Sequence, residues 1–427
     1  MGIWQEMGFS AIIYIAALAG INTDLYEAAV VDGANKWKRM LNVTLPGILP
    51  TIMIMLILKI GSLLEVGYEA IILLYQPATY ETADVINSYV YREGILNGRY
   101  DMATAVGLFN SVVGLLLIVI SNRLSKKIHR QRSLVGEEIM TESRGEKDFY
   151  RFNYVFLTLL MIIVLFPVLY VLSASFSSPD AVVSGRVILF PVEPTLDAYK
   201  AVFREPTIWL GYANTLFYTV AGTLVSMVLT ICGAYSLSKR RLKGRKAINL
   251  MISFTLVFNA GIIPIYMNFR SLDMLDTRSA IIFGFAISTF NVIILRTFFQ
   301  SVPEELEEAA RIDGASEATI LLRIMLPLSK AALATVTLFY AVGRWNGYFW
   351  AMVLLRSEDK VPLQVLLNRL VVQMKPSDSM MVTDSSYLIA ETVIYATIVV
   401  AVLPMMLFYP FIQKYFVHGV MIGSIKG

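Results

Sequence analysis

The chain has 427 residues, of which 56% are apolar and 16% are charged, and its formal net charge is +4. A soluble globular protein carries about a quarter charged residues, and the apolar residues here gather in blocks of about twenty, the length at which a helix crosses a bilayer. This composition excludes a soluble domain and argues against a nucleic-acid partner. It predicts an all-α polytopic membrane protein, embedded in lipid, whose loops carry the basic residues.

The apolar blocks predict about nine transmembrane helices. Three of them lie in the first third of the chain, near residues 8–24, 48–66 and 102–121. Six more follow, near residues 152–175, 212–236, 248–269, 279–298, 328–352 and 389–413. We therefore predict a partial module over residues 1–135 and a six-span module over 151–427, joined by a polar cytoplasmic linker at 136–150. Pro167 and Pro264 predict kinks within two of the spans.

Basic residues indicate the orientation of these spans. One basic cluster follows the third span, at 123–132, and another follows the fifth, at 239–246. Because cytoplasmic loops carry the excess of Lys and Arg, we expect both clusters in the cytoplasm, together with the C-terminus. The longer loops 177–211 and 355–388 are then expected on the outer face.

The strongest signal in the chain is a duplicated loop, with one copy in each module. Each copy reads Glu-Ala-Ala, two residues, Asp-Gly-Ala, and ends on Leu-Pro, and nine of 20 aligned positions are identical without a gap. The motif residues are Glu27, Ala28, Ala29, Asp32 and Gly33 in the first copy and Glu308, Ala309, Ala310, Asp313 and Gly314 in the second. Alanine and glutamate favour a short helix, and glycine adopts the left-handed conformation that ends one. Each copy is thus predicted to form a helix, a sharp turn and a second helix on the cytoplasmic face.

Two interpretations of the duplicated loop are open. A single copy could be an amphipathic connector that rests on lipid headgroups. The retention of Glu, Asp, Gly and Pro in register favours the other interpretation, in which both copies dock onto a repeated or dimeric cytoplasmic partner. Pro46 and Pro327 suit the first turn of the span after each loop, where a missing N–H costs nothing.

Cysteine, histidine and glycine patterns exclude several chemistries. Cys232 is the single cysteine and lies in an apolar run, so no disulfide framework can form. The two histidines, His129 and His418, have no second metal ligand nearby in the sequence, which argues against a zinc or haem site. The sequence contains no Gly-x-x-x-x-Gly-Lys-Ser/Thr phosphate loop. We therefore expect no cofactor bound by this chain, and any ATP must be hydrolysed by a partner.

The motif Glu-Ala-Ala-x-x-Asp-Gly-Ala, with Leu-Pro beyond it, resembles the EAA loop of ABC-importer permeases of the carbohydrate-uptake, maltose-permease type. Other motifs of the second module are similar to those of sugar permeases: Gly261 to Pro264, Arg296 to Phe299, Trp345-Asn346 and Val420 to Ser424. The nearest likeness is to permeases for aldouronate and other plant oligosaccharides. Residues 1–135 resemble the C-terminal half of a first permease, and 140–427 resemble a complete second one.

The resemblance implies a type I ABC-importer permease fold in a bacterial cell membrane. It implies that the ten motif residues belong to two coupling helices, which dock onto a cytoplasmic ATPase dimer that drives alternating access. An extracytoplasmic solute-binding protein would deliver an oligosaccharide, and the loop 355–388 is the candidate for its contact. The chain would have no catalytic residues of its own. We also expect the earlier spans of the first permease to be missing here, and Met140 resembles a natural start, as if two reading frames were joined.

Polar side chains inside spans are costly and usually face a cavity or the interior of a bundle. Sugars need hydrogen-bonding groups beside aromatic faces, so we predict a substrate path from six residues: Glu65, Tyr68, Asn291, Trp345, Asn346 and Tyr348. The alternative for each residue is a structural role, in helix packing or as an aromatic anchor at the membrane interface.

Two other classes of protein stay open at this point. An ion- or proton-coupled secondary transporter would carry charge relays and discontinuous helices at mid-membrane, but it gives no reason for a duplicated cytoplasmic loop. An integral membrane enzyme would need acids, histidines or metal ligands gathered at one face, and no such cluster is visible in the sequence. The importer permease is the interpretation that accounts for the duplication.

Overall fold

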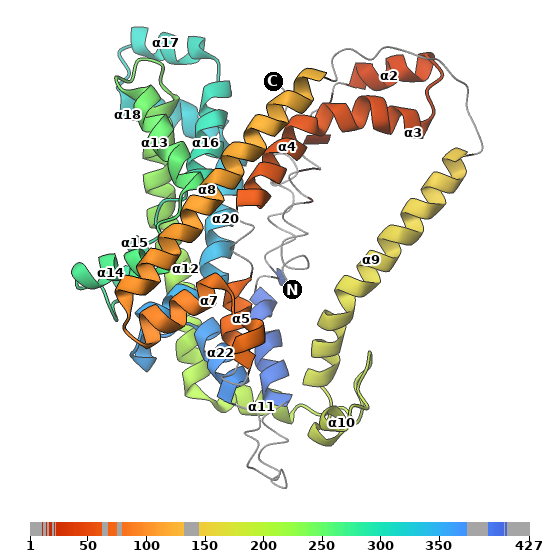
Figure 1. Ribbon diagram of the computed structural model, residues 1–427, viewed down its shortest axis with the longest axis vertical. Coiled ribbons are helices and arrows are strands. Elements are labelled where there is room, and N and C mark those ends of the chain that lie inside the picture. The colour runs from red at the N-terminus through yellow and green to blue at the C-terminus, as the bar shows by residue number, and fades with distance from the viewer. Residues whose placement is uncertain are drawn as a thin grey trace.

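The computed structural model describes residues 23–61, 67–74, 79–131, 145–373 and 392–404, together with positions 11, 14, 17, 18, 21, 406 and 407. Regular structure among these residues is helical throughout, as predicted. Long helices run between two ends of the molecule, and short helices gather at each end (Figure 1). The first predicted span lies mostly outside the described residues.

The first module is a series of short helices followed by one long one. Its described helices are α2 (Thr23–Val31), α3 (Lys36–Arg39), the π-helix η1 (Met40–Thr44), α4 (Leu45–Gly61), α5 (Tyr68–Leu74), α6 (Tyr80–Ala83), α7 (Ile86–Val90), the π-helix η3 (Tyr91–Leu96) and α8 (Tyr100–Gln131).

The second module contains longer helices, several of them divided. Its first helices are α9 (Gly145–Ser175), α10 (Pro179–Val183), α11 (Asp197–Arg204), α12 (Pro206–Ser238), α13 (Arg245–Val257), α14 (Ile262–Ser271) and α15 (Arg278–Phe283). The later ones are α16 (Thr289–Ser301), α17 (Glu304–Ile312), α18 (Glu317–Ile320), the π-helix η4 (Leu321–Met325), α19 (Leu326–Leu328), α20 (Lys330–Asn346), α21 (Phe349–Leu354), the 3-10 helix η5 (Glu358–Lys360), α22 (Leu363–Gln373) and the helix Thr392–Pro404.

Three described helices are long and apolar enough to cross a membrane, namely Tyr100–Ile120 within α8, Asn153–Ser175 within α9, and α12. A fourth candidate consists of Glu317–Leu328 and Lys330–Asn346, which meet at a bend of 86°. The structure thus confirms a helical, membrane-spanning protein among the described residues, but it does not confirm nine uninterrupted spans. Helix α9 begins at Gly145, so the end of the predicted polar linker is helical.

Two predicted spans are divided in the structure. The span predicted at 248–269 breaks between α13 and α14, where Gly261 has a φ of 88°, and the span predicted at 279–298 breaks between α15 and α16. Pro264 therefore lies in the first turn of α14, after the break, where its missing N–H leaves no helical carbonyl unpaired. The predicted kink within a continuous helix is wrong at Pro264. Pro167 does lie inside a continuous helix, α9.

Helix α12 is at the centre of the second module, where it packs against α15, α16, α20 and α22. Gly211 of α12 permits a close approach, since a Cβ there would lie 2.5 Å from the Leu366 side chain and 3.3 Å from the Leu363 backbone. Small residues let membrane helices approach in this way. Most of helix α9 lies apart from this bundle in Figure 1, and apolar side chains along it, including Tyr154 and Ile162, are exposed.

A buried apolar cluster joins the two modules. Val90 and Ala103 of the first module pack with Ile262, Ile263 and Phe349 of the second. The contact is tight at Gly94, because a Cβ there would lie 2.2 Å from the Ile263 side chain and 2.8 Å from the Cβ of Ala103. The two modules are therefore packed as one body along this surface.

Candidate functional site

The two duplicated loops have the same secondary structure, residue for residue. Helix α2 corresponds to α17, α3 to α18, and the π-helix η1 to η4, each at the 281-residue offset that the sequence repeat sets. Both loops lie at the same end of the molecule, α2–α3 on one side and α17–α18 on the other (Figure 1). The predicted helix, sharp turn and helix are thus present in both copies.

The turn in each loop has the same hydrogen bonds. Gly33 has a φ of 71° and Gly314 a φ of 78°, the left-handed region that favours glycine. The amide of Ala34 donates to the carbonyl of Ala29 at 2.9 Å, and the amide of Ala315 donates to the carbonyl of Ala310 at 2.9 Å. These bonds, with those from each glycine amide to the carbonyl three residues before it, form a Schellman motif.

The second helix of each loop begins with a side-chain cap, although the capping residue differs. The Lys38 amide donates to Asn35 Oδ1 at 2.9 Å in the first copy, and the Thr319 amide donates to Ser316 Oγ at 3.2 Å in the second. Asparagine and serine are both strong N-cap residues. The same backbone shape is therefore kept by different side chains, which indicates that the shape itself is required.

Pro46 and Pro327 lie in the first turn of α4 and α19, as predicted, but these helices continue directly from the π-helices before them. Each follows a π-turn within a continuous helical stretch, where the amide of Leu45 donates to the Met40 carbonyl and that of Leu326 to the Leu321 carbonyl. A proline ring clashes with the carbonyl four residues earlier in an α-helix. The wider π-turn accommodates Pro46 and Pro327, and in the second copy the helix then bends by 86°.

The side chains that face outward are also repeated. The motif acids Glu27, Asp32, Glu308 and Asp313 are exposed in both copies. Beside them lie three pairs of exposed apolar residues at the repeat offset: Leu25 and Leu306, Val31 and Ile312, and Leu41 and Leu322. Val31 and Ile312 are each 87% exposed, although both are large and apolar. We refer to these acids and apolar residues together as the paired loop surface.

Exposed apolar groups at matching places are typical of a binding surface. Leu41 and Leu322 are identical in the aligned copies, but the sequence gives no sign that Val31 and Ile312 are exposed. Their equivalence could have been found from the alignment, since isoleucine and valine are similar at that position. Their exposure depends on the turn at Gly33 and Gly314, which a sequence does not show directly.

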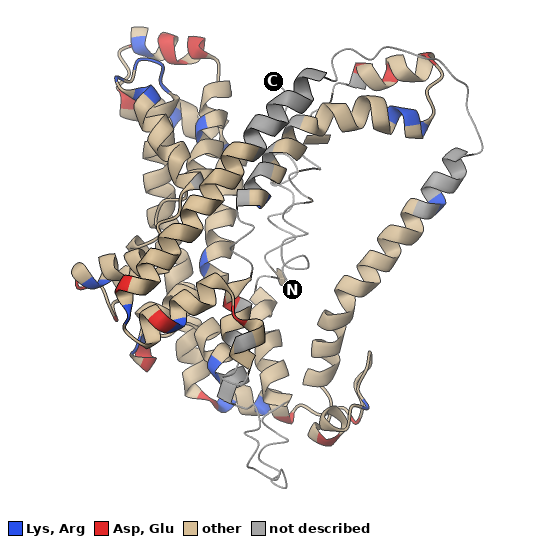
Figure 2. Ribbon diagram, in the orientation of Figure 1, with Lys and Arg blue, Asp and Glu red and all other residues tan. Residues whose placement is uncertain are grey.

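On its inner side the second loop contacts the end of α12 and the turn after it. Lys239 forms an ion pair with Glu307, and Arg241 forms one with Glu317. Arg311 links the two acids, at 3.2 Å from Glu307 and 3.3 Å from Glu317. A cavity of about 390 Å³ lies beside these groups, lined by Ser238, Arg240, Arg245, Phe299, Gln300, Val302, Glu304 and Glu308 as well. Charges of both signs gather around α17 and α18 in Figure 2.

The structure brings together two of the six residues predicted for a substrate path. Tyr68 and Tyr348 pack against the same apolar cluster between the modules, and the Tyr68 ring lies 5.3 Å from that of Phe349. The hydroxyl of Tyr348 is buried and has no hydrogen-bond partner in the part of the chain that the structure describes. Glu69, next to Tyr68, is partly buried at the same surface. A buried hydroxyl without a partner is costly, so this place suits a polar ligand.

Three of the other four residues do not join that group. Trp345 is buried within the second module, with its ring 5.8 Å from that of Tyr212, and Asn346 is exposed at the end of α20. Asn291 is buried in the first turn of α16. Glu65 lies outside the described residues. The packing contacts of Trp345 and Asn291 fit the structural alternative better than a place in the path.

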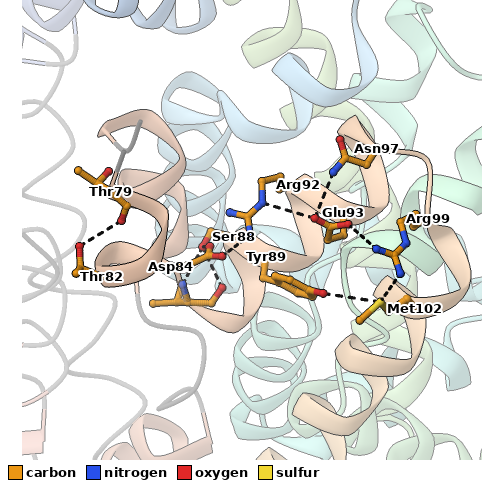
Figure 3. A network of polar contacts seen from close by, with 11 residues as sticks. Thr79, Thr82, Asp84, Ser88, Tyr89, Arg92, Glu93, Asn97, Arg99 and Met102 are labelled. Atoms are coloured by element: carbon orange, nitrogen blue, oxygen red, sulfur yellow. Dashed lines mark hydrogen bonds and ion pairs between the residues drawn. The ribbon is translucent and has the colours of Figure 1, made fainter. Parts of the chain in front are cut away.

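A polar network that sequence analysis missed lies in the first module (Figure 3). Arg92 forms an ion pair with Asp84 at 2.6 Å and approaches Glu93 at 3.7 Å, and its guanidinium lies 4.4 Å from the Tyr80 ring. Ser88 donates to Asp84 at 2.6 Å. The network braces the short helices α6 and α7 against η3. The only signal in the sequence is an acid eight residues before an arginine, a spacing too common to single out.

The fold and the paired loops define a class of protein, a helical membrane protein with two matching loops at one end. The chain belongs to the family of inner membrane components of binding-protein-dependent transport systems, which matches residues 1–133 and 139–422. It therefore contains two segments of this family in one chain.

Relatives agree with this family membership. The chain is 42% identical over 276 residues to the polygalacturonan/rhamnogalacturonan transport system permease protein YtcP of Bacillus subtilis (strain 168), a match that covers 64% of this chain and 96% of that protein. It is 46% identical over 125 residues to YteP of the same system and strain, covering 29% of this chain and 39% of that protein.

A solved structure is also similar. The crystal structure of a bacterial ABC transporter involved in the import of the acidic polysaccharide alginate contains a chain with 44% identity and a TM-score of 0.60, covering 65% of this chain and 99% of that one. These matches confirm the predicted family of sugar-importer permeases, and none of them supports a secondary transporter.

Proposed function

We propose that this permease carries oligosaccharides that contain uronic acids, delivered by an extracytoplasmic solute-binding protein and driven by a separate cytoplasmic ATPase dimer. The relatives named above belong to transport systems for polygalacturonan, rhamnogalacturonan and alginate, which share acidic sugar units. The chain itself is not an enzyme and binds no cofactor in this proposal, since ATP is bound and hydrolysed by the partner.

The observation that carries the proposal is the paired loop surface. Two loops with the same backbone present the same exposed acids and apolar residues at one end of the molecule. A dimeric partner offers two equivalent sites, and matched surfaces are what such a partner requires. The sites are Glu27, Ala28, Ala29, Asp32 and Gly33, with Glu308, Ala309, Ala310, Asp313 and Gly314. Lipid headgroups impose no such residue-by-residue match, so they account for the repeat less well.

Closure of the ATPase dimer on ATP would move the two loops relative to each other. The first loop continues through η1 into α4, and the second continues through η4 and α19 to the 86° bend before α20, so their motion would reach the membrane helices. The apolar cluster between the modules, where Tyr68 and Tyr348 meet, would then open toward one side or the other. Alternation of this kind needs two packings of the same helices that differ little in free energy.

The membrane topology belongs to the proposal as well. If each divided pair is one span, then α13–α14, α15–α16 and α19–α20 join α4, α8, α9, α12 and the helix Thr392–Pro404. Together with the span predicted at 8–24, these helices would make nine membrane spans. Both loops and the C-terminus would face the cytoplasm of a bacterial cell, and 355–388 would face the binding protein.

The test is ATP hydrolysis by the reconstituted chain, its ATPase and its binding protein in lipid nanodiscs. We expect oligogalacturonides or alginate oligosaccharides, bound to the binding protein, to stimulate hydrolysis at least threefold over neutral cello-oligosaccharides. Stimulation by neutral sugars alone would overturn the substrate class. Uptake into vesicles that follows an ion gradient and needs no ATP would overturn the proposal as a whole.

A further inference from the structure

The inner side of the second loop has a feature that the first loop lacks. Five residues form a connected polar group between the loop and the end of α12: Lys239, Arg241, Glu307, Arg311 and Glu317. We call this group the clamp. Tyr235 of α12 completes it, because its hydroxyl donates to Glu317 at 2.8 Å and its ring lies 4.0 Å from Lys239 Nζ.

The clamp holds both helices of the loop at once. Glu307 and Arg311 are on α17 and Glu317 is on α18, whereas their partners Tyr235, Lys239 and Arg241 are on α12 or in the turn that follows it. Ile320 and Met325, just beyond, are buried in an apolar cluster with Ala234 and Tyr235. The second loop is thus attached to α12 by polar and apolar contacts together.

Burial separates one pair of the clamp, Lys239 and Glu307, from ordinary surface ion pairs. The side chains of Lys239 and Glu307 are only 11% and 10% exposed. Breaking such a pair leaves a charge that is shielded from water and has lost its main partner, which is more costly than breaking an exposed pair. Arg240 and Glu304 provide that contrast in the same loop, since they lie 3.2 Å apart but are 81% and 63% exposed.

The first loop cannot form the same clamp, although its backbone is the same. At the repeat offset, Glu307, Arg311 and Glu317 are replaced by Tyr26, Val30 and Lys36. The Tyr26 hydroxyl instead lies 2.9 Å from Thr44 Oγ1, within its own loop and π-turn. The outward surfaces of the two loops are therefore alike, while their attachments to the membrane helices differ.

We propose that the clamp residues are positioning residues that fix the second loop to α12, so that movement of this loop reaches the membrane bundle through α12. The proposal rests on the proposed function, in which the loops receive motion from the ATPase. Helix α12 packs against α15, α16, α20 and α22, so it can carry a displacement to most of the second module. Among the described residues the first loop leads through η1 into α4 and contacts α9, so the two loops are attached to different helices and have unequal roles.

The first test measures attachment and needs no partner. The full chain in nanodiscs is compared with Glu307→Gln, with the milder Arg241→Gln at the rim, and with Arg240→Gln as the matched control. Hydrogen exchange of the α17 and α18 amides is expected to rise at least tenfold in Glu307→Gln, to rise less in Arg241→Gln, and to stay unchanged in the control. Exchange in α2 should not change in any variant. Equal exchange in Glu307→Gln and the control would overturn the clamp.

The second test measures transmission, with ATPase and binding protein added. We expect Glu307→Gln to retain bound ATPase and basal hydrolysis, because the outward surface is intact, while sugar transported per ATP falls at least threefold. If Glu307 had only a structural role, its replacement would lower the amount of folded protein or of assembled complex and leave the sugar transported per ATP unchanged. That result would overturn the positioning role. If the wild-type chain bound no ATPase, the proposed function would fail, and the exchange test would still decide whether the clamp exists.

Discussion

Gly314 shows how one residue determines the shape of a loop. Its φ of 78° lies in the left-handed region, and a Cβ at this position would meet no atom within 4 Å. The only cost of a larger residue is therefore backbone strain, roughly 1 kcal/mol for alanine. Asparagine enters this region more readily than alanine does.

We accordingly expect Gly314→Ala to weaken ATPase binding more than Gly314→Asn, although alanine is the smaller change. The measurement is the affinity of purified ATPase for nanodiscs that contain each variant. Equal affinities for the two variants would show that the turn conformation is not what the partner requires.

Arg344 is a charged residue near the end of α20 whose contacts give it a structural role. Its guanidinium donates to the carbonyls of Ile281, Ile282 and Phe285, the last at 2.8 Å, and to Ser226 Oγ at 3.3 Å. These carbonyls include groups at the end of α15 that have no partner within the helix.

Replacement of Arg344 by glutamine should leave several of these carbonyls unpaired. We expect Arg344→Gln to lower the free energy of unfolding by about 3 kcal/mol, seen as a lower Tm of the chain in detergent. Arg356→Gln, at an exposed arginine of the same module, is the control and should leave the Tm unchanged. A Tm for Arg344→Gln equal to that of the control would contradict the assigned contacts.

Glu317 gives the clamp a defined pH dependence. Burial alone would raise the pKa of Glu317, but hydrogen bonds from Arg241 and Tyr235 outweigh it and lower the pKa from 4.5 to about 2. A carboxyl with a lowered pKa stabilises the folded state above its unfolded pKa and loses that contribution as the pH falls through its folded pKa. The basic groups around it in the clamp are Lys239, Arg241 and Arg311.

The clamp should therefore be insensitive to pH in the physiological range. Exchange protection of α17 and α18, corrected for the intrinsic rate, is expected to be equal at pH 7.5 and 5.5 and to decrease only from about 4.5 toward 2. A decrease between pH 7.5 and 5.5 would mean that another group controls the attachment of the loop.

At the scale of the elements, the contact between η3 and α14 holds the two modules together. Gly94 leaves no room for a Cβ between Ile263 and Ala103, whereas a Cβ at Gly107, also facing the second module, would meet nothing within 4 Å. Overpacking of this kind usually costs about 1–3 kcal/mol.

We expect Gly94→Ala to lower the Tm of the chain, and Gly107→Ala to leave it unchanged or raise it slightly, because alanine is the better helix former. The comparison uses one detergent and one heating rate. If both variants unfold at the wild-type Tm, the modules do not depend on this contact.

The sequence predicted some helices accurately and others poorly. The long spans at α8, α9 and α12 and the two loops followed from apolar blocks and the repeat, which are local properties. The breaks near Gly261 and between α15 and α16 could not be foreseen, because they depend on how the helices pack. The same limit applied to the path residues: Trp345 and Tyr348 are three positions apart, yet one packs inside the second module and the other faces the first.

At the scale of the whole molecule, the orientation in the membrane is open to a direct check. Cys232 is the only cysteine, so a Cys232→Ser background permits single cysteines at Ser184, before α11, and at Ser316, before α18. In intact cells an impermeant maleimide should label the cysteine at 184, and it should label the cysteine at 316 only after the cells are opened. The reverse pattern would invert the assigned orientation.

The central claim is that the two loops bind one dimeric ATPase through matching surfaces. The most direct measurement is the binding of that ATPase to nanodiscs that contain Val31→Asp, Ile312→Asp or both, since each side chain is 87% exposed and its replacement should not disturb the fold. We predict at least a tenfold weaker affinity for each single variant and no detectable binding for the double variant. Wild-type affinity in the double variant would contradict the account.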